Sequence, residues 1–368
     1  MVGGTVDSRE RALLAIGHET PDRIPVDFWA SAGFRARIKS ELGMSFEDFL
    51  DGQDVDFRYI PGPSYVGPPL DGEQSGIATD IWGVPRKAVT LEVRGQFEHY
   101  WEVVAPPLAD AATLDEIDAY PHWPSADRFD YRNVESQCDL VREQGRVVVF
   151  MGDRLNRIAQ LKPAMYIRGP DRIMLDMALE PDLARVLFEK IKAFYMDYLE
   201  RILTAASGKI DIVLTGDDFG AQQGPLVSPG MWEAFLRRGF EEYVRLIKAH
   251  GAVAMHHTCG SVRALIPQMI ECGLDVLQSL QPEVRGMEPA GLKEDYGDRL
   301  SFHGGMSIQK TLPYGTPEDV CRAVKHLAQA MGEGGGYVFC TAHNVQADTP
   351  MANVLTMLDA YRRYGTYG

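Results

Sequence analysis

Short apolar runs rich in β-branched residues alternate with helical patterns from about residue 145 to the end of the chain. The runs have the length and composition of buried strands. They cover residues 147–151, 210–215, 253–257, 275–280, 300–304 and 337–341. Between them, apolar residues recur at intervals of three and four, which predicts helices. Repeated strand–helix units predict parallel strands that are covered by helices.

A seventh strand is predicted near the N-terminus, at residues 23–28. A TIM barrel needs eight strands, so we expect the missing one within residues 29–146. That region contains a Pro- and Gly-rich stretch (61–72) and alternating polar and aromatic residues (96–104). It predicts an irregular insertion with a β-hairpin, packed over the mouth of the barrel. We therefore expect one α/β domain, a (β/α)8 TIM barrel, over residues 1–368. An open doubly wound sheet is the alternative.

The charge balance and the cysteine content exclude several classes of protein. The chain has 37 Lys and Arg against 52 Asp and Glu, a net charge of −15, which argues against nucleic acid or an anionic membrane as the main partner. No apolar stretch approaches the roughly 20 residues that span a bilayer. Residues 1–11 lack the apolar segment of a signal peptide, so a cytoplasmic location is expected. Five cysteines in a chain of this length do not form a disulfide framework.

The tripeptide His257-Thr258-Cys259, at the end of the predicted strand 253–257, is the most informative motif of the chain. Side chains alternate along a strand, so His257 and Cys259 should point the same way and His256 the other way. One imidazole and one thiol at a single point are half of a tetrahedral zinc site. For the third ligand we favour His343, just after the last predicted strand, over Cys340 inside it. Three protein ligands would leave one coordination position open, as in catalytic zinc sites.

Other polar side chains follow the predicted strands, where TIM barrels carry their active sites. They are Asp27, Asp217, Asp218, Gln278 and His303. The adjacent Asp217 and Asp218 cannot both face the barrel mouth in regular strand geometry, so we expect one to line the site and the other to form local contacts. Gln222 and Asn344 lie in loops, where they could form hydrogen bonds with an uncharged substrate.

Several segments, in order along nearly the whole chain, resemble the uroporphyrinogen decarboxylase superfamily, in particular its methyltransferase-like branch. The matching stretches are residues 10–15 with 21–27, 79–84, 216–220 through 228–229, 257–260, 302–305, and 342–344 with Pro350. The resemblance implies a single (β/α)8 barrel. In this branch it also implies a zinc ion held by a His-X-Cys pair and a distant cysteine. Here His257 and Cys259 match the pair, and His343 stands at the position of the distant cysteine.

The resemblance further implies a zinc-dependent methyltransferase, which exchanges a methyl group with methylcobalamin carried by a separate corrinoid protein. Zinc would bind an acceptor thiol, or polarise the leaving oxygen of an O-methyl donor. His303, Asp217 or Asp218 would then move a proton. The residues expected to contact the small-molecule substrate are Asp27, Asp80, Gln222, Gln278 and Asn344. The sequence leaves the oligomeric state open, a homodimer included.

Two other functions stay open from the sequence alone. A metal-free decarboxylase acting on a tetrapyrrole would hold its substrate with an arginine-rich N-terminal loop. Residues 29–37 lack that loop and keep only Arg35 and Arg37, on a predicted helix. Asp80, in Thr79-Asp80-Ile81, resembles the aspartate with which such decarboxylases hold the pyrrole nitrogens. The other function is a non-catalytic ligand-binding barrel. Bound zinc would separate the methyltransferase from both.

Overall fold

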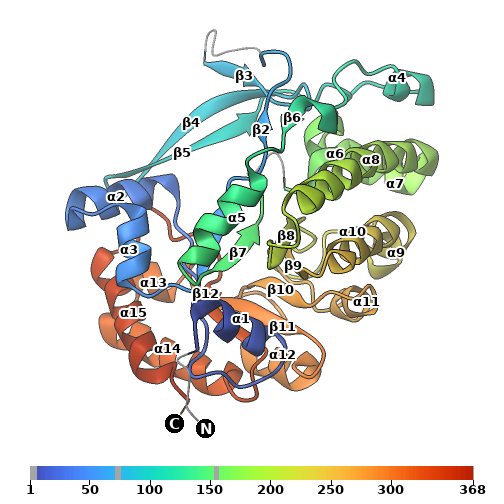
Figure 1. The fold of residues 1–368 in the computed structure, drawn as a ribbon. Coiled ribbons are helices and arrows are strands. Elements are labelled where there is room, and N and C mark those ends of the chain that lie inside the picture. Colours follow the sequence, from blue (N-terminus) through green and yellow to red (C-terminus); the bar gives the residue numbers. More distant parts are fainter. Residues whose placement is uncertain (1–5, 71–75, 153–156, 368) are drawn as a thin grey trace.

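The centre of the computed structural model, which describes residues 6–70, 76–152 and 157–367, is one curled sheet of parallel strands (Figure 1). Its seven strands follow the order β1-β7-β8-β9-β10-β11-β12. They are β1 (Phe57–Ile60), β7 (Val147–Phe150), β8 (Ile212–Gly216), β9 (Val253–His257), β10 (Val276–Leu280), β11 (Ser301–Met306) and β12 (Tyr337–Thr341). The six strands predicted from residue 147 onward are confirmed, with ends that differ by at most two residues. The strand expected within residues 29–146 is β1.

The predicted strand at residues 23–28 is an extended segment with isolated bridges, so the prediction of a regular strand there is wrong. Val26 forms a parallel bridge with Phe339 of β12, and its carbonyl accepts the N–H of Asp56 (2.9 Å), directly before β1. The segment therefore lies between the two edge strands of the sheet. Pro25 has no N–H to give to a regular ladder. The described sheet thus has seven regular strands, one fewer than predicted.

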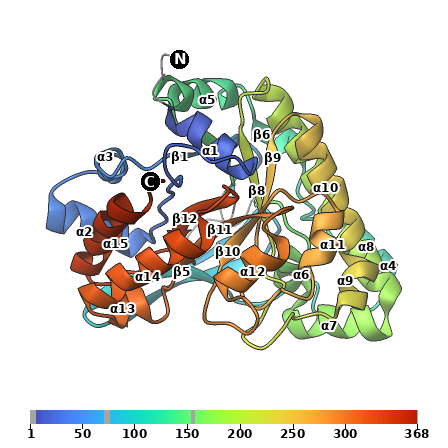
Figure 2. The same ribbon diagram turned by 90° about the horizontal axis from the view of Figure 1, so that it is seen from below.

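Helices cover the outer face of the curled sheet (Figure 2). Apart from α2, α3 and α4 of the insertion described below, the described α-helices are α1 (Ser8–Ile16), α5 (Val134–Glu143), α6 (Leu161–Arg168), α7 (Pro170–Leu179), α8 (Pro181–Ala205), α9 (Pro229–Phe235), α10 (Arg237–Ala249), α11 (Ile266–Glu271), α12 (Pro289–Tyr296), α13 (Thr311–Tyr314), α14 (Pro317–Met331) and α15 (Met351–Tyr364). Of these, α1 packs instead on the apolar residues of the inner face, through Ala12 and Ile16. Local sequence signals set the ends of the helices. For example, α14 begins at Pro317 after Thr316, whose hydroxyl accepts the N–H of Asp319 (3.2 Å). No described helix is long and apolar enough to cross a membrane.

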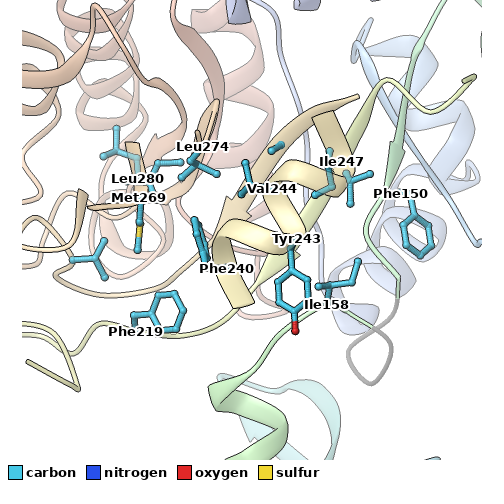
Figure 3. Close-up of a cluster of buried hydrophobic side chains, with 14 of the residues drawn as sticks. Phe150, Ile158, Phe219, Phe240, Tyr243, Val244, Ile247, Met269, Leu274 and Leu280 are labelled. Atoms are coloured by element: carbon cyan, nitrogen blue, oxygen red, sulfur yellow. The ribbon is translucent and has the colours of Figure 1, made fainter. Parts of the chain in front are cut away.

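One face of α10 shows how a helix joins this core. Phe240, Tyr243, Val244 and Ile247 recur at helical spacing and are all buried, among apolar side chains from strands, loops and α11 (Figure 3). The opposite face carries charged residues, so the apolar stripe fixes which side of α10 meets the sheet.

The inner face of the sheet has its own apolar cluster, and strand alternation decides its membership. Val147 and Val149 of β7 point inward, whereas Val148 and Phe150 belong to the outer layer. In β9 the inward residue Met255 is followed by His256, which points outward. There His256 Nδ1 lies 2.8 Å from Thr215 Oγ1, and its ring packs on Phe219 and Phe240. The outward direction predicted for His256 is therefore confirmed, and His257 is left on the inner face.

The insertion predicted within residues 29–146 contains a small antiparallel sheet. It consists of β3 (Ile77–Thr79), β4 (Pro85–Val93) and β5 (Gln96–Val103), and the same region holds α2 (Ala32–Leu42), α3 (Phe46–Gly52), β2 (Ser64–Tyr65), α4 (Leu114–Asp118) and β6 (Phe129–Asp130). The predicted hairpin is β4–β5 (Figure 1). It meets the loop after β12, where Glu98 Oε1 accepts the N–H of Ala347 (2.7 Å). The hairpin therefore packs at the carboxyl-terminal edge of the parallel sheet, where the candidate site lies.

Candidate metal centre

His257 and Cys259 point to the same side of the chain, at the carboxyl end of β9. His257 Nε2 lies 3.4 Å from Cys259 Sγ. The His257 side chain is buried, whereas Cys259 is partly exposed. Strand alternation brings the two residues together, as the sequence predicts. A soft sulfur and an imidazole nitrogen at this separation can share one metal ion.

His343 completes a group of three candidate ligands. Single donor atoms of His257, Cys259 and His343 all lie within 4.8 Å of one another. The two imidazole rings meet edge to face, with 5.5 Å between their centroids. His343 reaches the group from the turn after β12, in which the Thr341 hydroxyl donates to the His343 carbonyl (2.6 Å). Cys340 lies within β12 and belongs instead to the buried inner cluster.

Gln278 orients His257 from behind. His257 Nδ1 donates to the amide oxygen of Gln278, a fully buried residue of the neighbouring strand β10. This hydrogen bond leaves the Nε2 lone pair directed at Cys259. A hydrogen-bonded partner that fixes the tautomer of a ligating imidazole is typical of metal sites. The amide oxygen of Gln278, expected to bind substrate, is therefore committed to His257.

Burial sets the protonation of the three donors. It lowers the pKa of His257, and it lowers that of His343 to about 3, so both imidazoles are neutral at pH 7. Burial, and then the nearby negative charge of Asp218, raises the pKa of Cys259 to about 12. Neutral imidazoles can bind a metal ion without change, whereas the thiol must first lose its proton.

The adjacent carboxylates of Asp217 and Asp218, directly after β8, point to different groups, as the sequence predicts. Asp217 accepts the backbone N–H groups of Gln160 (2.5 Å), Leu161 (2.8 Å) and Lys162 (2.6 Å) at the start of α6. Asp218 Oδ1 lies 3.6 Å from His257 Nε2, and Oδ2 pairs with the Lys162 ammonium. Burial alone would raise the pKa of Asp218, but the positive charge of Lys162 helps to hold it well below its usual range. Asp218 is therefore the carboxylate that faces the candidate metal centre.

Asp27 and His303, predicted separately, form one buried pair on the inner face of the sheet. His303 Nε2 donates to Asp27 Oδ2 (2.9 Å), which also accepts the Tyr59 hydroxyl (2.5 Å). Together with Cys340 they are a second group whose donor atoms lie within 4.8 Å. Trp29 separates the two groups, since its ring stacks on His257 (6.0 Å between centroids) and also packs on His303 (6.2 Å). Trp29 therefore lies between His303 and the His257–Cys259 pair. The role of His303 in proton transfer stays a prediction.

The remaining predicted residues lie at the rim of the site or in its walls. Asp80 accepts the Arg86 Nε (2.6 Å) and two backbone N–H groups, of Trp82 (2.8 Å) and Val84 (3.0 Å). Gln222 is exposed on the loop after β8, beside a hollow that Cys259 also lines. The structure therefore brings Gln222 near the centre and fixes Asp80 in an ion pair with Arg86.

Two cavities meet at His343 and Asn344. The first, of about 330 Å³, is also lined by His257, Arg157, Lys162 and aromatic side chains, and we call it the His257 cavity. The second, of about 620 Å³, is lined by Trp29 and Tyr59, and we call it the Tyr59 cavity. Arg157 borders both. Sequence reasoning missed Arg157, Lys162, Trp29 and Tyr59. The only signal for them in the sequence was their position. Arg157 follows β7, Lys162 lies in α6, Trp29 follows the 23–28 segment, and Tyr59 lies in β1.

The sequence of this chain matches the family described as Uroporphyrinogen decarboxylase (URO-D) over residues 158–364. The chain belongs to this family. The matched region exceeds half of the chain and contains all three candidate metal ligands.

Relatives in the uroporphyrinogen decarboxylase family carry two different activities in their names. The uroporphyrinogen decarboxylase of Coxiella burnetii (strain RSA 493 / Nine Mile phase I) is 23% identical over 194 residues, 50% of this chain and 48% of that protein. The methylcobamide:CoM methyltransferase MtaA of Methanosarcina barkeri is 27% identical over 154 residues, 42% of each chain. The chain thus matches about half the length of these relatives or less. Because the two sequence identities are so similar, they do not show which of the two activities this chain has.

A solved structure shares the fold over almost the whole chain. A methyltransferase from Methanosarcina mazei superposes with a TM-score of 0.65 at 16% identity and covers 97% of this chain and 99% of its own. At this identity the likeness shows the fold alone. The choice of activity depends on the chemistry of the site.

Proposed function

We propose that this member of the uroporphyrinogen decarboxylase family is a zinc-dependent methyltransferase. It moves a methyl group between a corrinoid carrier protein and a small molecule, either from an O-methyl donor or to a thiol acceptor. The observation that carries the proposal is the group formed by His257, Cys259 and His343 beside a cavity. Two imidazoles and one thiolate suit zinc and leave one coordination position for a substrate atom.

The surroundings of the three donors fit a metal ion better than they fit a structural hydrogen-bond cluster. His257 Nδ1 is held by Gln278, so Nε2 presents its lone pair to the point where Cys259 Sγ also lies. Both imidazoles are kept neutral by burial, which is the form that binds metal. When bound, zinc lowers the pKa of a thiol, or polarises an ether oxygen, that occupies its open position.

Asp218 is the carboxylate that we propose to hold Cys259 at the metal centre. The Cys259 backbone N–H donates to Asp218 Oδ1 (3.3 Å), and the negative charge of this carboxylate lies near the thiol. Lys162 balances the charge of this carboxylate. Trp29 excludes water from the inner side of His257 by stacking on its ring. These residues hold the donors in place, and the thiol proton is released to solvent when the metal ion binds.

The corrinoid partner is proposed from the M. barkeri relative, whose name states a methylcobamide substrate for that protein. We also propose that the curled sheet and the segment around Val26 are the complete (β/α)8 barrel of a single domain, because that segment forms hydrogen bonds next to both edge strands.

The alternative function, a metal-free decarboxylase, is less well supported. Arg35 and Arg37, the remnants of the expected arginine loop, lie on α2, and Arg37 pairs with Glu41 (2.6 Å) on the same helix.

Methyl transfer from methylcobalamin tests the proposal. Zinc-loaded protein is incubated with free methylcobalamin and a panel of small thiols, and the S-methyl product is quantified. The reverse reaction is assayed with O-methyl compounds and reduced cobalamin. We expect zinc-dependent product in one of the two directions, and its loss in Cys259→Ala. If zinc-loaded protein transfers no methyl group in either direction, the proposed function is wrong.

A further inference from the structure

The His257 cavity is lined by three cationic side chains, Arg86, Arg157 and Lys162. Two of them already have a carboxylate partner. Arg86 pairs with Asp80 (2.6 Å), and Lys162 pairs with Asp218. Arg157 has no ion pair with any residue that the structure describes, and its contact to the Met151 sulfur (3.0 Å) carries no charge. Among the residues that the structure describes, Arg157 is therefore the one cation of this cavity lining without a paired carboxylate.

The fold keeps Arg157 in this position by leaving space for its side chain. A Cβ atom at Gly216, the last residue of β8, would lie 2.5 Å from Arg157 Cδ. Glycine at this strand end therefore lets the arginine stem cross the sheet edge next to His257. The guanidinium lies 6.0 Å from the centre of the Trp29 ring. Its Nε is buried, with no hydrogen-bond partner among the described residues.

An arginine in this setting is costly unless something pairs with it. Burial lowers the pKa of Arg157, because the surrounding protein replaces the water that would solvate the charge. Arg35 is a useful contrast, since it lines the Tyr59 cavity but is exposed to solvent. Arg35 is more exposed than Arg157, so water solvates its charge better, whereas the free donors of Arg157 face the two cavities that it borders. A planar carboxylate matches the fork of a guanidinium.

We propose that Arg157 binds the carboxylate of a small organic acid in the His257 cavity, and that this acid is the small-molecule substrate. The cavity, of about 330 Å³, reaches from Arg157 to His257 and His343, so an acid held at one end presents its other end to the candidate metal centre. The aromatic side chain of Tyr166 also lines this cavity. The role of this acid as methyl donor or acceptor rests on the proposed function, whereas the anion site does not.

A matched pair of probes separates the charge effect from the metal effect. Calorimetric titrations compare 3-mercaptopropionate with 3-mercapto-1-propanol, which has the same chain and no charge, on metal-free and on zinc-loaded protein at pH 7. On metal-free protein we expect the acid to bind about tenfold tighter or more, the size of a charge-assisted hydrogen bond. Arg157→Gln should abolish that preference, Arg157→Lys should keep part of it, and the control Arg35→Gln should keep all of it. Zinc content and thermal midpoint establish that each variant is folded.

The outcomes of this experiment are distinct. Equal binding of acid and alcohol, no detectable binding of the acid, or a preference that survives in Arg157→Gln would each overturn the anion site. A zinc-dependent gain in affinity for both thiols would support the proposed function. Its absence, with the preference for the acid intact, would refute the thiol-acceptor form of the proposed function and leave the anion site standing.

Discussion

His257 donates its Nδ1 proton to the amide oxygen of Gln278, and its Nε2 faces Cys259 Sγ at 3.4 Å. This relationship joins two neighbouring strands, because Gln278 of β10 is paired in register with His257 of β9. Strand pairing alone therefore places Gln278 where it can orient the imidazole of His257. The candidate metal centre is therefore built on the rigid part of the fold, which keeps donor positions well defined.

Loss of Gln278 should weaken zinc binding while the three donors stay in place. Gln278→Ala removes the acceptor that fixes the His257 tautomer, so we expect affinity to fall roughly 10- to 100-fold, as for other residues that orient metal ligands. Competition with a chromophoric chelator measures the change. Gln268→Ala, which alters a glutamine on the remote helix α11, is the control and should leave the affinity unchanged. Unaltered affinity in Gln278→Ala would mean that the His257 ring is fixed by its packing on Trp29 instead.

His343→Ala should lose far more zinc affinity than Cys340→Ala. His343 lies with the His257–Cys259 pair, whereas Cys340 is buried on the inner face of the sheet beside Asp27 and His303. Cys340→Ala is expected to cost roughly 1 kcal/mol of stability, typical of a small buried truncation, and to keep zinc. Equilibrium dialysis and denaturant unfolding on both variants measure the two effects. The reverse order of zinc loss would make Cys340 the distant ligand.

Zinc affinity should rise with pH. The thiol of Cys259, whose pKa is raised to about 12 by burial and by Asp218, is protonated at neutral pH and must lose its proton on binding. The pKa values of His257 and His343 are lowered, so these ligands are already neutral and release none. We expect about a tenfold gain in affinity per pH unit between about pH 6.5 and 8.5, one proton released per ion. Chelator competition across this range measures the slope, and a flat profile would exclude Cys259 as a ligand.

The α10 stripe should be a main source of stability without a direct role at the site. Phe240 is buried against the outward-facing His256 (4.8 Å between ring centroids), so Phe240→Ala leaves a cavity and is expected to cost about 3–5 kcal/mol. Leu179→Ala, at an exposed leucine, should change the free energy of unfolding by less than about 0.5 kcal/mol. Denaturant unfolding compares the two. Similar costs would mean that the buried stripe does not stabilise the fold.

Much of the fold could be predicted from the sequence, because buried parallel strands have a clear apolar signature. The strands from residue 147 onward follow that pattern closely. The segment around Val26 did not form a regular strand, because Pro25 interrupts the backbone ladder. The strand β1 is only four residues long and contains Arg58, so its pattern gave no clear signal.

The candidate site was predictable where neighbours in sequence are neighbours in space. His257 and Cys259 follow from alternation along one strand. The Asp27–His303 pair could not be predicted, because 276 residues separate its members and only the closure of the curled sheet brings them together. Arg157 could not be predicted either. Its proposed role follows from the lack of an ion-pair partner among the described residues, which no local sequence pattern reports.

Metal content is the most direct test of the central claim, which is that His257, Cys259 and His343 bind one zinc ion. Protein purified without added metal is analysed for elemental composition, together with His257→Ala, Cys259→Ala and His343→Ala, each verified as folded by circular dichroism. The account predicts about one zinc per wild-type chain, its loss in His257→Ala and Cys259→Ala, and weakened zinc binding in His343→Ala, as expected when a three-ligand site loses one ligand. Stoichiometric zinc in both His257→Ala and Cys259→Ala, or wild-type protein that binds no zinc even when it is supplied, would contradict it.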